Sequence, residues 1–450
     1  MSGGAAPAGV FEERFDALAR YVTGAARAGE ALFAELHAER ADYLRLNRGR
    51  VRQAGTVERA TAVLRLIAGD RQARITCPLV PGRRGRAQLD RALGRLRDAL
   101  ARADADPFLA WQREPARSRV QRGGLVATPE QVVTTLGAAA GDADLIGFHA
   151  AGPVAAGLAS NLGHRHFHEA VWSSFDFTVQ VDEGRAVKET WSGRDWDAAA
   201  VAAAVAQARE HAALLRRPAR QLAPGSYRAL LAPHAVADLL SLLGWGGFSL
   251  RAQRTGQSPL ARLQRGEVQF AEMFSLAEDL ALHDVPRFQS DGFVRPDCLP
   301  LIAAGRQVDA LVSPRSAREF GGAAGNGADD GEAPLAPTLG AGSLRQADAL
   351  AALDTGLAIS NLWYLNYSDR AACRVTGMTR FATLWVEDGW PVAPVGTMRF
   401  DDSLYRLFGP ALQALTDEVR RMPSTETYDG RQFGGVAAPS ALVSALTFTL

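Results

Sequence analysis

The 450-residue chain has few cysteines, a single lysine and no long apolar run. Three scattered cysteines, Cys77, Cys298 and Cys373, are too few for a disulfide framework or a zinc knuckle, and they favour a reducing compartment. No stretch of 18 apolar residues occurs, and the N-terminal segment has acidic residues where a signal peptide needs an apolar core. These absences predict a cytoplasmic protein that does not enter a membrane.

The chain also lacks an excess of either positive or negative charge. Fifty basic residues, of which only Lys188 is a lysine, nearly cancel 49 acidic ones, and no long basic run appears. Because nucleic-acid binding depends on neutralising phosphates with clustered cations, this balance argues against a nucleic-acid partner. The hydrophobic share of 47% is typical of a globular protein, and the length favours two domains.

The common short motifs of catalysis are absent as well. The sequence holds no GxSxG elbow, Walker A loop or GxGxxG turn. Cys373 lies between Arg370 and Arg374, whose charges could lower a thiol pKa, but no histidine partner is identifiable and a buried structural cysteine is favoured. The acidic run at 329–332 could bind a cation, although an isolated acidic loop is usually only solvated.

Periodicity predicts an α+β fold with antiparallel sheets. Residues 42–79 alternate apolar and polar side chains around turns at 47–49 and 69–70, as hairpins do, and strands are again expected over 144–192. Residues 11–36 predict an opening helix that continues toward a strand, and further helices are expected at 86–106, 129–141 and 195–217. Because helices and strands are grouped rather than alternating, a Rossmann or TIM layout is disfavoured.

A proline-rich polar stretch, residues 218–227, is the predicted domain boundary. It separates an N-terminal α+β domain, 1–222, from a C-terminal domain, 223–450, expected to be mostly antiparallel and barrel-like with helices. Within the second domain, residues 320–343 are almost entirely Gly, Ala, Pro and acid. This segment predicts a flexible loop, either a disordered insertion or a lid carrying Asn326.

Three histidines at alternate positions, His164, His166 and His168, would share one face of an extended strand. Such spacing can supply three zinc ligands. Continued alternation puts Trp172 on the histidine face, and Phe167, Phe175, Phe177 and Glu169 on the opposite face. The histidines are therefore expected to face away from the core, on a polar strand surface that is solvated or lines a cleft; a metal site is the alternative.

The C-terminal half resembles a known family. The segments "SYRALLAPHAVADLLSLLGWGG", "FQSDGFVRPDCLPLIAAGRQVDALVSP" and "GLAISNLWYLNYSDRAACRVTGMTRFATLWVEDGWPVAPVG" are similar to the TldD/PmbA family of metalloproteases. The meander and "SNLGHRHFHEAVWSSFDF" resemble its first domain. The resemblance implies a TldD/PmbA-like fold and a subunit of a peptidase complex that degrades or trims unfolded peptides.

In that family the TldD-type subunit binds zinc through a HExxxH helix, and the TldE/PmbA-type subunit lacks this motif. If His234 is the first histidine, Ala235 replaces the glutamate and Leu239 the second histidine. The resemblance therefore implies a PmbA/TldE-like chain that binds no cofactor itself and pairs with a zinc-carrying TldD-like partner, or with itself as a homodimer. Whether the family's link to DNA gyrase applies is left open.

Two alternatives remain: a self-sufficient metallohydrolase using the three histidines, and a peptide-binding protein with no protease partner. In the leading hypothesis, a mixture of aromatic, amide and basic side chains is suited to holding a peptide. The candidates are Asn326, Asn361, Trp363, Tyr364, Tyr367 and Arg370. The same aromatic pattern is also typical of a structural strand.

Overall fold

The N-terminal part of the computed structural model is one long, curved sheet that is antiparallel except for the parallel pair β5–β8. The structure describes residues 4–6, 9–182, 184–327 and 331–449. The strand order is β4-β3-β2-β7-β8-β5, with β9 paired to β8. The strands are β2 (Ala31–Asn47), β3 (Arg50–Ala68), β4 (Arg71–Pro78), β5 (Arg117–Arg122), β7 (Asp144–Ser160), β8 (Arg165–Gln180) and β9 (Ala186–Gly193). A short pair, β1 (Gly4–Ala6) and β6 (Gly124–Val126), lies apart from it.

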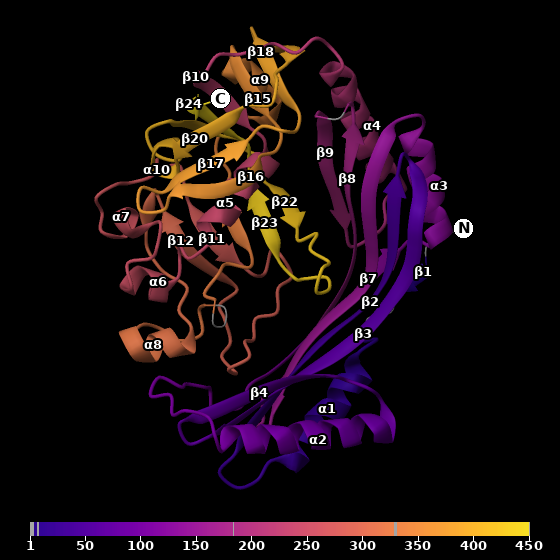
Figure 1. The fold of residues 1–450 in the computed structure, drawn as a ribbon, viewed down its shortest axis with the longest axis vertical. Helices are drawn as coiled ribbons and strands as arrows, with labels where there is room; N and C mark the ends of the chain where they lie inside the picture. The colour runs from indigo at the N-terminus through magenta and orange to yellow at the C-terminus, as the bar shows by residue number, and fades with distance from the viewer. Residues whose placement is uncertain (1–3, 7–8, 183, 328–330, 450) are drawn as a thin grey trace.

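Two helix pairs cover opposite ends of this sheet (Figure 1). Helices α1 (Glu12–Ala25) and α2 (Gly82–Leu100) pack on one end, and α3 (Pro129–Ala140) and α4 (Ala198–Leu215) on the other. Each pair presents an apolar stripe to the strands and closes its own hydrophobic cluster. The opposite face of β8 contacts the C-terminal part of the chain, through Phe288 and Phe433.

The C-terminal part contains two further sheets around one large core. The larger runs β16-β17-β20-β24-β10-β15-β18-β19, with β21 paired to β24. Its strands are β10 (Gly225–Leu231), β15 (Gly356–Ile359), β16 (Trp363–Asp369), β17 (Arg374–Met378), β18 (Thr383–Glu387), β19 (Trp390–Pro394), β20 (Arg399–Ser403), β21 (Leu412–Leu415) and β24 (Ala441–Phe448).

The smaller sheet runs β13-β12-β11-β14-β23-β22. Its strands are β11 (Leu276–Asp279), β12 (Cys298–Ala303), β13 (Arg306–Gln307), β14 (Pro337–Leu339), β22 (Arg420–Pro423) and β23 (Gly435–Ala438). The helices of this half are α5 (Pro233–Leu243), α6 (Leu250–Arg254), α7 (Ala261–Gln264), α8 (Pro314–Phe320), α9 (Ala349–Leu353) and α10 (Leu404–Leu407). Helix α5 supplies much of the core, because its alanine, valine and leucine side chains are almost all buried.

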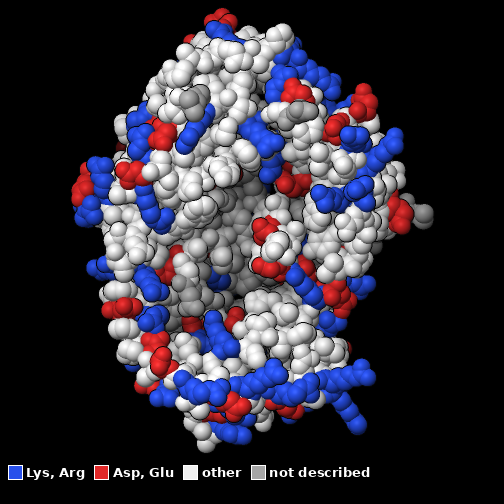
Figure 2. Space-filling view, viewed as in Figure 1, with Lys and Arg blue, Asp and Glu red and all other residues white. Residues whose placement is uncertain are grey.

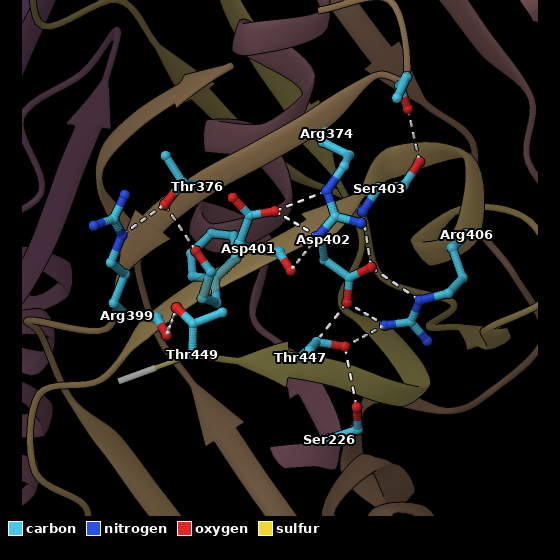
Figure 3. Close-up of polar contacts among 12 residues, drawn as sticks. Ser226, Arg374, Thr376, Arg399, Asp401, Asp402, Ser403, Arg406, Thr447 and Thr449 are labelled. Carbon is cyan, nitrogen blue, oxygen red and sulfur yellow. Dashed lines mark hydrogen bonds and ion pairs between the residues drawn. The ribbon is translucent and has the colours of Figure 1, made fainter. Parts of the chain in front are cut away.

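A paired polar network ties β20, α10 and β24 together (Figure 3). The carboxylate of Asp402, which is 3% exposed, accepts hydrogen bonds from the Arg406 guanidinium and from the backbone N–H groups of Ser403 and Thr447. Beside it, Arg374 pairs with Asp401 at 2.6 Å. The acidic pair 401–402 is therefore part of the architecture of this half.

The α+β class with antiparallel sheets is confirmed, and the predicted hairpins over 42–79 correspond to β2, β3 and β4. The strands of the long sheet end at Gly193, and those of the two later sheets begin at Gly225, inside the stretch 218–227. Among the described residues, no helix is long and apolar enough to cross a membrane.

The Gly-rich segment 320–343 includes a strand that its composition did not predict, β14, which pairs with β11 and β23. Asn326 fastens the segment to the chain at 310–312: its side-chain oxygen accepts from Val312 N–H at 2.9 Å and its amide donates to the Ala310 carbonyl at 3.1 Å. Of the predicted cation-binding run, Asp329 and Asp330 lie outside the described residues. Glu332 is 2% exposed and accepts hydrogen bonds from Ser249, Arg251 and Ser313.

Candidate functional site

The three histidines of β8 are buried, which corrects the prediction of a polar, outward strand surface. His164, His166 and His168 are 2%, 1% and 5% exposed. Phe288 stacks on His166 with ring centroids 5.2 Å apart, and Phe433 meets His168 edge-on at 5.0 Å. Alternation did separate the histidines from the core of their own sheet, but the C-terminal half covers that face.

Burial lowers the pKa of each of these histidines, to about 4 for His166 and His168, so they are neutral. The Nδ1 atoms of His164 and His166 are within 2.7 and 2.8 Å of the hydroxyls of Ser160 and Ser118. Among the described residues no group of three His, Cys, Asp or Glu side chains could hold a metal ion. The three histidines therefore do not converge on a metal, and they form part of the contact between the two halves.

Glu169 lies on the opposite face of β8, as alternation predicted. Its carboxylate accepts hydrogen bonds from the backbone N–H groups of Gly9, Val10 and Phe11, at the start of α1. A carboxylate at a helix N-terminus satisfies donors that have no partner within the helix. Glu169 therefore anchors α1 to the sheet and does not act with the histidines.

A cleft of about 620 Å³ opens between the long sheet and the C-terminal half. Figure 2 shows the surface hollowed between these two parts of the molecule. One wall is formed by Asp176, Lys188 and Thr190 on β8 and β9, and the other by α5. Segments 333–337, 361–362, 422–426 and 432–436 complete the lining. Residues more than 200 positions apart in the sequence thus meet around one open space.

Helix α5 turns a polar stripe toward this cleft. His234, Ala237, Asp238 and Ser241 line it, spaced by three and four residues as one helix face requires. The other faces carry the leucines and valines of the core, with Ala235 and Leu239 0% and 1% exposed. A helix that buries its apolar side chains in the core and turns its polar side chains toward a cleft suits the wall of a binding site.

Burial perturbs both ionisable groups on this stripe. It raises the pKa of Asp238 to about 6 and lowers that of His234 to about 3. One Asp238 oxygen accepts the Leu362 N–H at 3.0 Å. Among the described residues, no cation forms an ion pair with this carboxylate. Perturbed groups of this kind facing a cleft are typical of functional sites.

Several polar atoms around α5 have no hydrogen-bond partner among the described residues. They include Nε2 of His234, Oδ1 of Asn361 and Oγ of Ser360. Asn361 is only 4% exposed, so its unpaired oxygen costs free energy in this state. On the opposite wall, Nζ of Lys188, the chain's single lysine, lies 3.8 Å from Asp176 Oδ2.

The residues of this wall do not fit a catalytic zinc ion, which needs three converging protein ligands. Of the α5 residues that line the cleft, only His234 and Asp238 carry side chains that commonly bind zinc. Ala235 and Leu239 occupy the positions where the resemblance expects glutamate and the second histidine. The buried aliphatic groups offer no donor atom.

Of the six predicted peptide-binding residues, only Asn361 lines the cleft. Trp363 and Tyr364 lie on β16, 37% and 77% exposed, with their rings 5.4 Å apart. The Tyr367 hydroxyl donates to the Leu242 carbonyl, and Arg370 donates to those of Trp245 and Gln257. These two side chains hold β16 and its turn against the end of α5.

Cys373 is fully buried, and burial raises the pKa of its thiol to about 12. The neighbouring arginines do not activate it: Arg370 donates to backbone carbonyls, and Arg374 pairs with Asp401. The interpretation as a structural cysteine therefore fits, and a nucleophilic role does not.

Sequence reasoning missed His234 and Asp238 as a pair, and also Lys188 and Asp176. A signal for the first two was present, since both interrupt an otherwise apolar helix at i and i+4. No comparable signal existed for the wall on β8 and β9, because only the packing of the two halves brings it opposite α5.

Comparison with known proteins gives one family. Residues 224–450 match the C-terminal domain of the PmbA/TldA metallopeptidases. No curated protein sequence matches the chain significantly. Several solved structures share its fold, among them three from different organisms. TldE from Thermococcus kodakarensis superposes with a TM-score of 0.79 at 15% identity, covering 97% of this chain and 100% of that one.

The other two are candidate modulators of DNA gyrase. The Thermotoga maritima structure has a TM-score of 0.74 at 15% identity, covering 98% of this chain and 99% of its own. The Bacteroides thetaiotaomicron structure has a TM-score of 0.75 at 13% identity, covering 97% and 98%. At such identities the superpositions establish the fold alone.

Proposed function

Because the chain belongs to the PmbA/TldD metallopeptidase family, we propose that it is the subunit without zinc of a cytoplasmic TldD/TldE-type peptidase complex. In this role it binds segments of unfolded peptide and helps to present them, while a TldD-like partner supplies the metal and the hydrolytic chemistry.

The observation that carries the proposal is the combination found at α5. The helix lines an open cleft with His234 and Asp238, yet buries Ala235 and Leu239 where a zinc subunit needs ligands. A zinc peptidase uses its metal to activate water, so a chain without the ligand set contributes binding rather than hydrolysis. An open, partly apolar cleft with scattered polar groups suits an extended peptide.

The first test is reconstitution. The purified chain, a TldD-like partner and their mixture are compared for peptidase activity on an unstructured peptide and for zinc by elemental analysis. We expect activity and zinc in the mixture and in the partner's fraction, and neither in this chain alone. Strong activity with stoichiometric zinc in the lone chain would refute the proposal.

The second test blocks the cleft. Ser241→Trp places a large side chain on the cleft face of α5, and Ser368→Trp, on the exposed part of β16, is its matched control. We expect Ser241→Trp to lower peptide binding and turnover by the complex about tenfold or more, with assembly unchanged on gel filtration. If the two substitutions had equal effects on peptide binding and turnover, the cleft would not be the peptide-binding site.

A further inference from the structure

We propose that Asp238, Asn361 and His234 form a subsite for a primary ammonium group of the bound peptide, either its N-terminus or a lysine side chain. This inference rests on the proposed peptide-binding function and specifies what one wall of the cleft recognises. It arises from acceptor atoms that the described part of the chain leaves unpaired.

The first part of the subsite is the Asp238 carboxylate. One oxygen is fixed by the Leu362 N–H at 3.0 Å, and the other accepts no hydrogen bond among the described residues. The carboxylate contrasts with Asp176 across the cleft, which already has Lys188 at 3.8 Å and a hydrogen bond from Thr190 at 2.7 Å. Asp238 is thus a carboxylate held in position by one backbone N–H and, among the described residues, without a cation in direct contact. Against the larger effect of burial, the Lys188 ammonium, which is paired with Asp176, acts on Asp238 through space and lowers its pKa.

Two neutral acceptors adjoin it. His234 lies one helical turn before Asp238 on the same face, and the Leu362 N–H bond places Asn361 beside the carboxylate. Nε2 of His234 and Oδ1 of Asn361 are both buried and both lack a hydrogen-bond partner among the described residues. The subsite requires the His234 tautomer with its proton on Nδ1, in which Nε2 is an acceptor. With the carboxylate they make three acceptors, and a primary ammonium has three N–H donors and no acceptor.

Other ligands fit this wall less well. An anionic group would meet the Asp238 carboxylate, and the cation opposite, Lys188, is already paired with Asp176. A bound divalent metal would need a third strong ligand, and no group of three such side chains exists among the described residues. An organic cation pairs with the buried carboxylate without a third anionic ligand, and its N–H groups satisfy the neutral acceptors.

The test uses three hexapeptides and isothermal titration calorimetry with the full chain at about pH 7, where the Asp238 carboxylate is mostly ionised and the peptide N-terminus is mostly protonated. The first is Ala-Ala-Phe-Ala-Ala-Gly with a free N-terminus, the second its N-acetylated form, and the third the N-acetylated form with lysine in place of phenylalanine. We expect at least one of the two amine-bearing peptides to bind tenfold or more tightly than the acetylated phenylalanine peptide. A preference for the first identifies the N-terminus as the source of the ammonium, and a preference for the third identifies lysine.

Variants of the chain test whether Asp238 is the source of the preference for an amine-bearing peptide. Asp238→Asn should reduce it to less than twofold, and Asp238→Glu should restore part of it. Asp401→Asn, which alters an acidic side chain outside the cleft, should leave it unchanged. Circular dichroism checks folding, and if Asp238→Asn fails to fold, the peptide comparison on the unaltered chain still decides.

The outcomes separate the two proposals. Binding of all three peptides with equal affinity overturns the ammonium subsite and leaves peptide binding standing. No binding of any peptide, by the chain or by its complex with a TldD-like partner, overturns both. A preference that survives in Asp238→Asn overturns the assignment to this wall.

Discussion

Two aspartates in the C-terminal half, the buried Asp402 and the half-buried Asp238, differ in how many hydrogen bonds and ion pairs their carboxylates receive. Asp402 accepts hydrogen bonds from Arg406, Ser403 and Thr447 (Figure 3), whereas Asp238 receives one, from Leu362, and faces an open cleft. A charge that is buried and paired contributes to stability, and a charge that is buried and unpaired costs free energy. Proteins tolerate such a cost mainly where the group has a function.

The largest effect is expected from the paired aspartate. Asp402→Asn removes the negative charge opposite Arg406 and leaves the guanidinium beside a neutral amide. We expect a loss of about 2–4 kcal/mol in the free energy of unfolding, measured by urea denaturation followed through tryptophan fluorescence. A change below about 0.5 kcal/mol would mean that the network adds nothing to stability.

The corresponding substitution in the cleft, Asp238→Asn, should raise the free energy of unfolding rather than lower it. Burial raises the folded-state pKa of Asp238 to about 6, above an unfolded value of about 3.9. The folded protein therefore binds the extra proton between these values, and its stability falls as the pH rises from about 4 to about 6. Asn avoids this ionisation and keeps an oxygen for the Leu362 N–H.

Asp238→Asn should thus raise the free energy of unfolding at pH 8 by as much as about 3 kcal/mol, with no gain near pH 4. Thermal melts at both pH values measure the difference. Destabilisation at pH 8 would show that the carboxylate is satisfied after all.

For His234, on the same face of α5, we expect an effect of acidic pH on stability. Burial lowers the folded-state pKa of His234 to about 3, below an unfolded value of about 6.5. Below pH 6.5 the unfolded chain binds a proton that the folded chain does not, so stability is lost as the pH falls. Between about pH 7.5 and 5, the free energy of unfolding of His234→Gln should fall by about 2 kcal/mol less than that of the unaltered chain. This is because pH 5 lies about 1.5 units below the unfolded-state pKa, and each unit is worth about 1.4 kcal/mol.

The matched control for this measurement is His37→Gln, because the side chain of His37 is 58% exposed. Between about pH 7.5 and 5, the free energy of unfolding of this variant should change as much as that of the unaltered chain. Identical profiles for the two variants would place His234 in a solvated environment.

The smallest contrast concerns two serines. The Ser403 hydroxyl donates to the Ala372 carbonyl at 3.0 Å, whereas the Ser360 hydroxyl has no partner among the described residues. Ser403→Ala should cost about 1 kcal/mol, and Ser360→Ala should be neutral or stabilising by a few tenths. Differential scanning calorimetry of the two variants tests the order, and a reversed order would contradict the difference between the two regions.

Local patterns predicted much of the fold. Alternation identified the hairpins of β2 to β4 and put Glu169 on the face opposite the histidines, because side chains of a strand alternate whatever the strand packs against. The same reasoning failed for the burial of His166 and His168. Their covers, Phe288 and Phe433, come from more than 100 residues later in the chain, and alternation describes one strand only.

The sequence by itself determined the grouping of helices and strands, the balance of charge and the apolar character of α5, which is interrupted by His234, Asp238 and Ser241. Only the tertiary structure decided that His234 and Asp238 face a cleft whose other wall carries Lys188 and Asp176. The spacing of residues on one helix fixes which of them share a face. Which surface that face meets depends on how the two halves bury their remaining apolar area, a property of the whole chain.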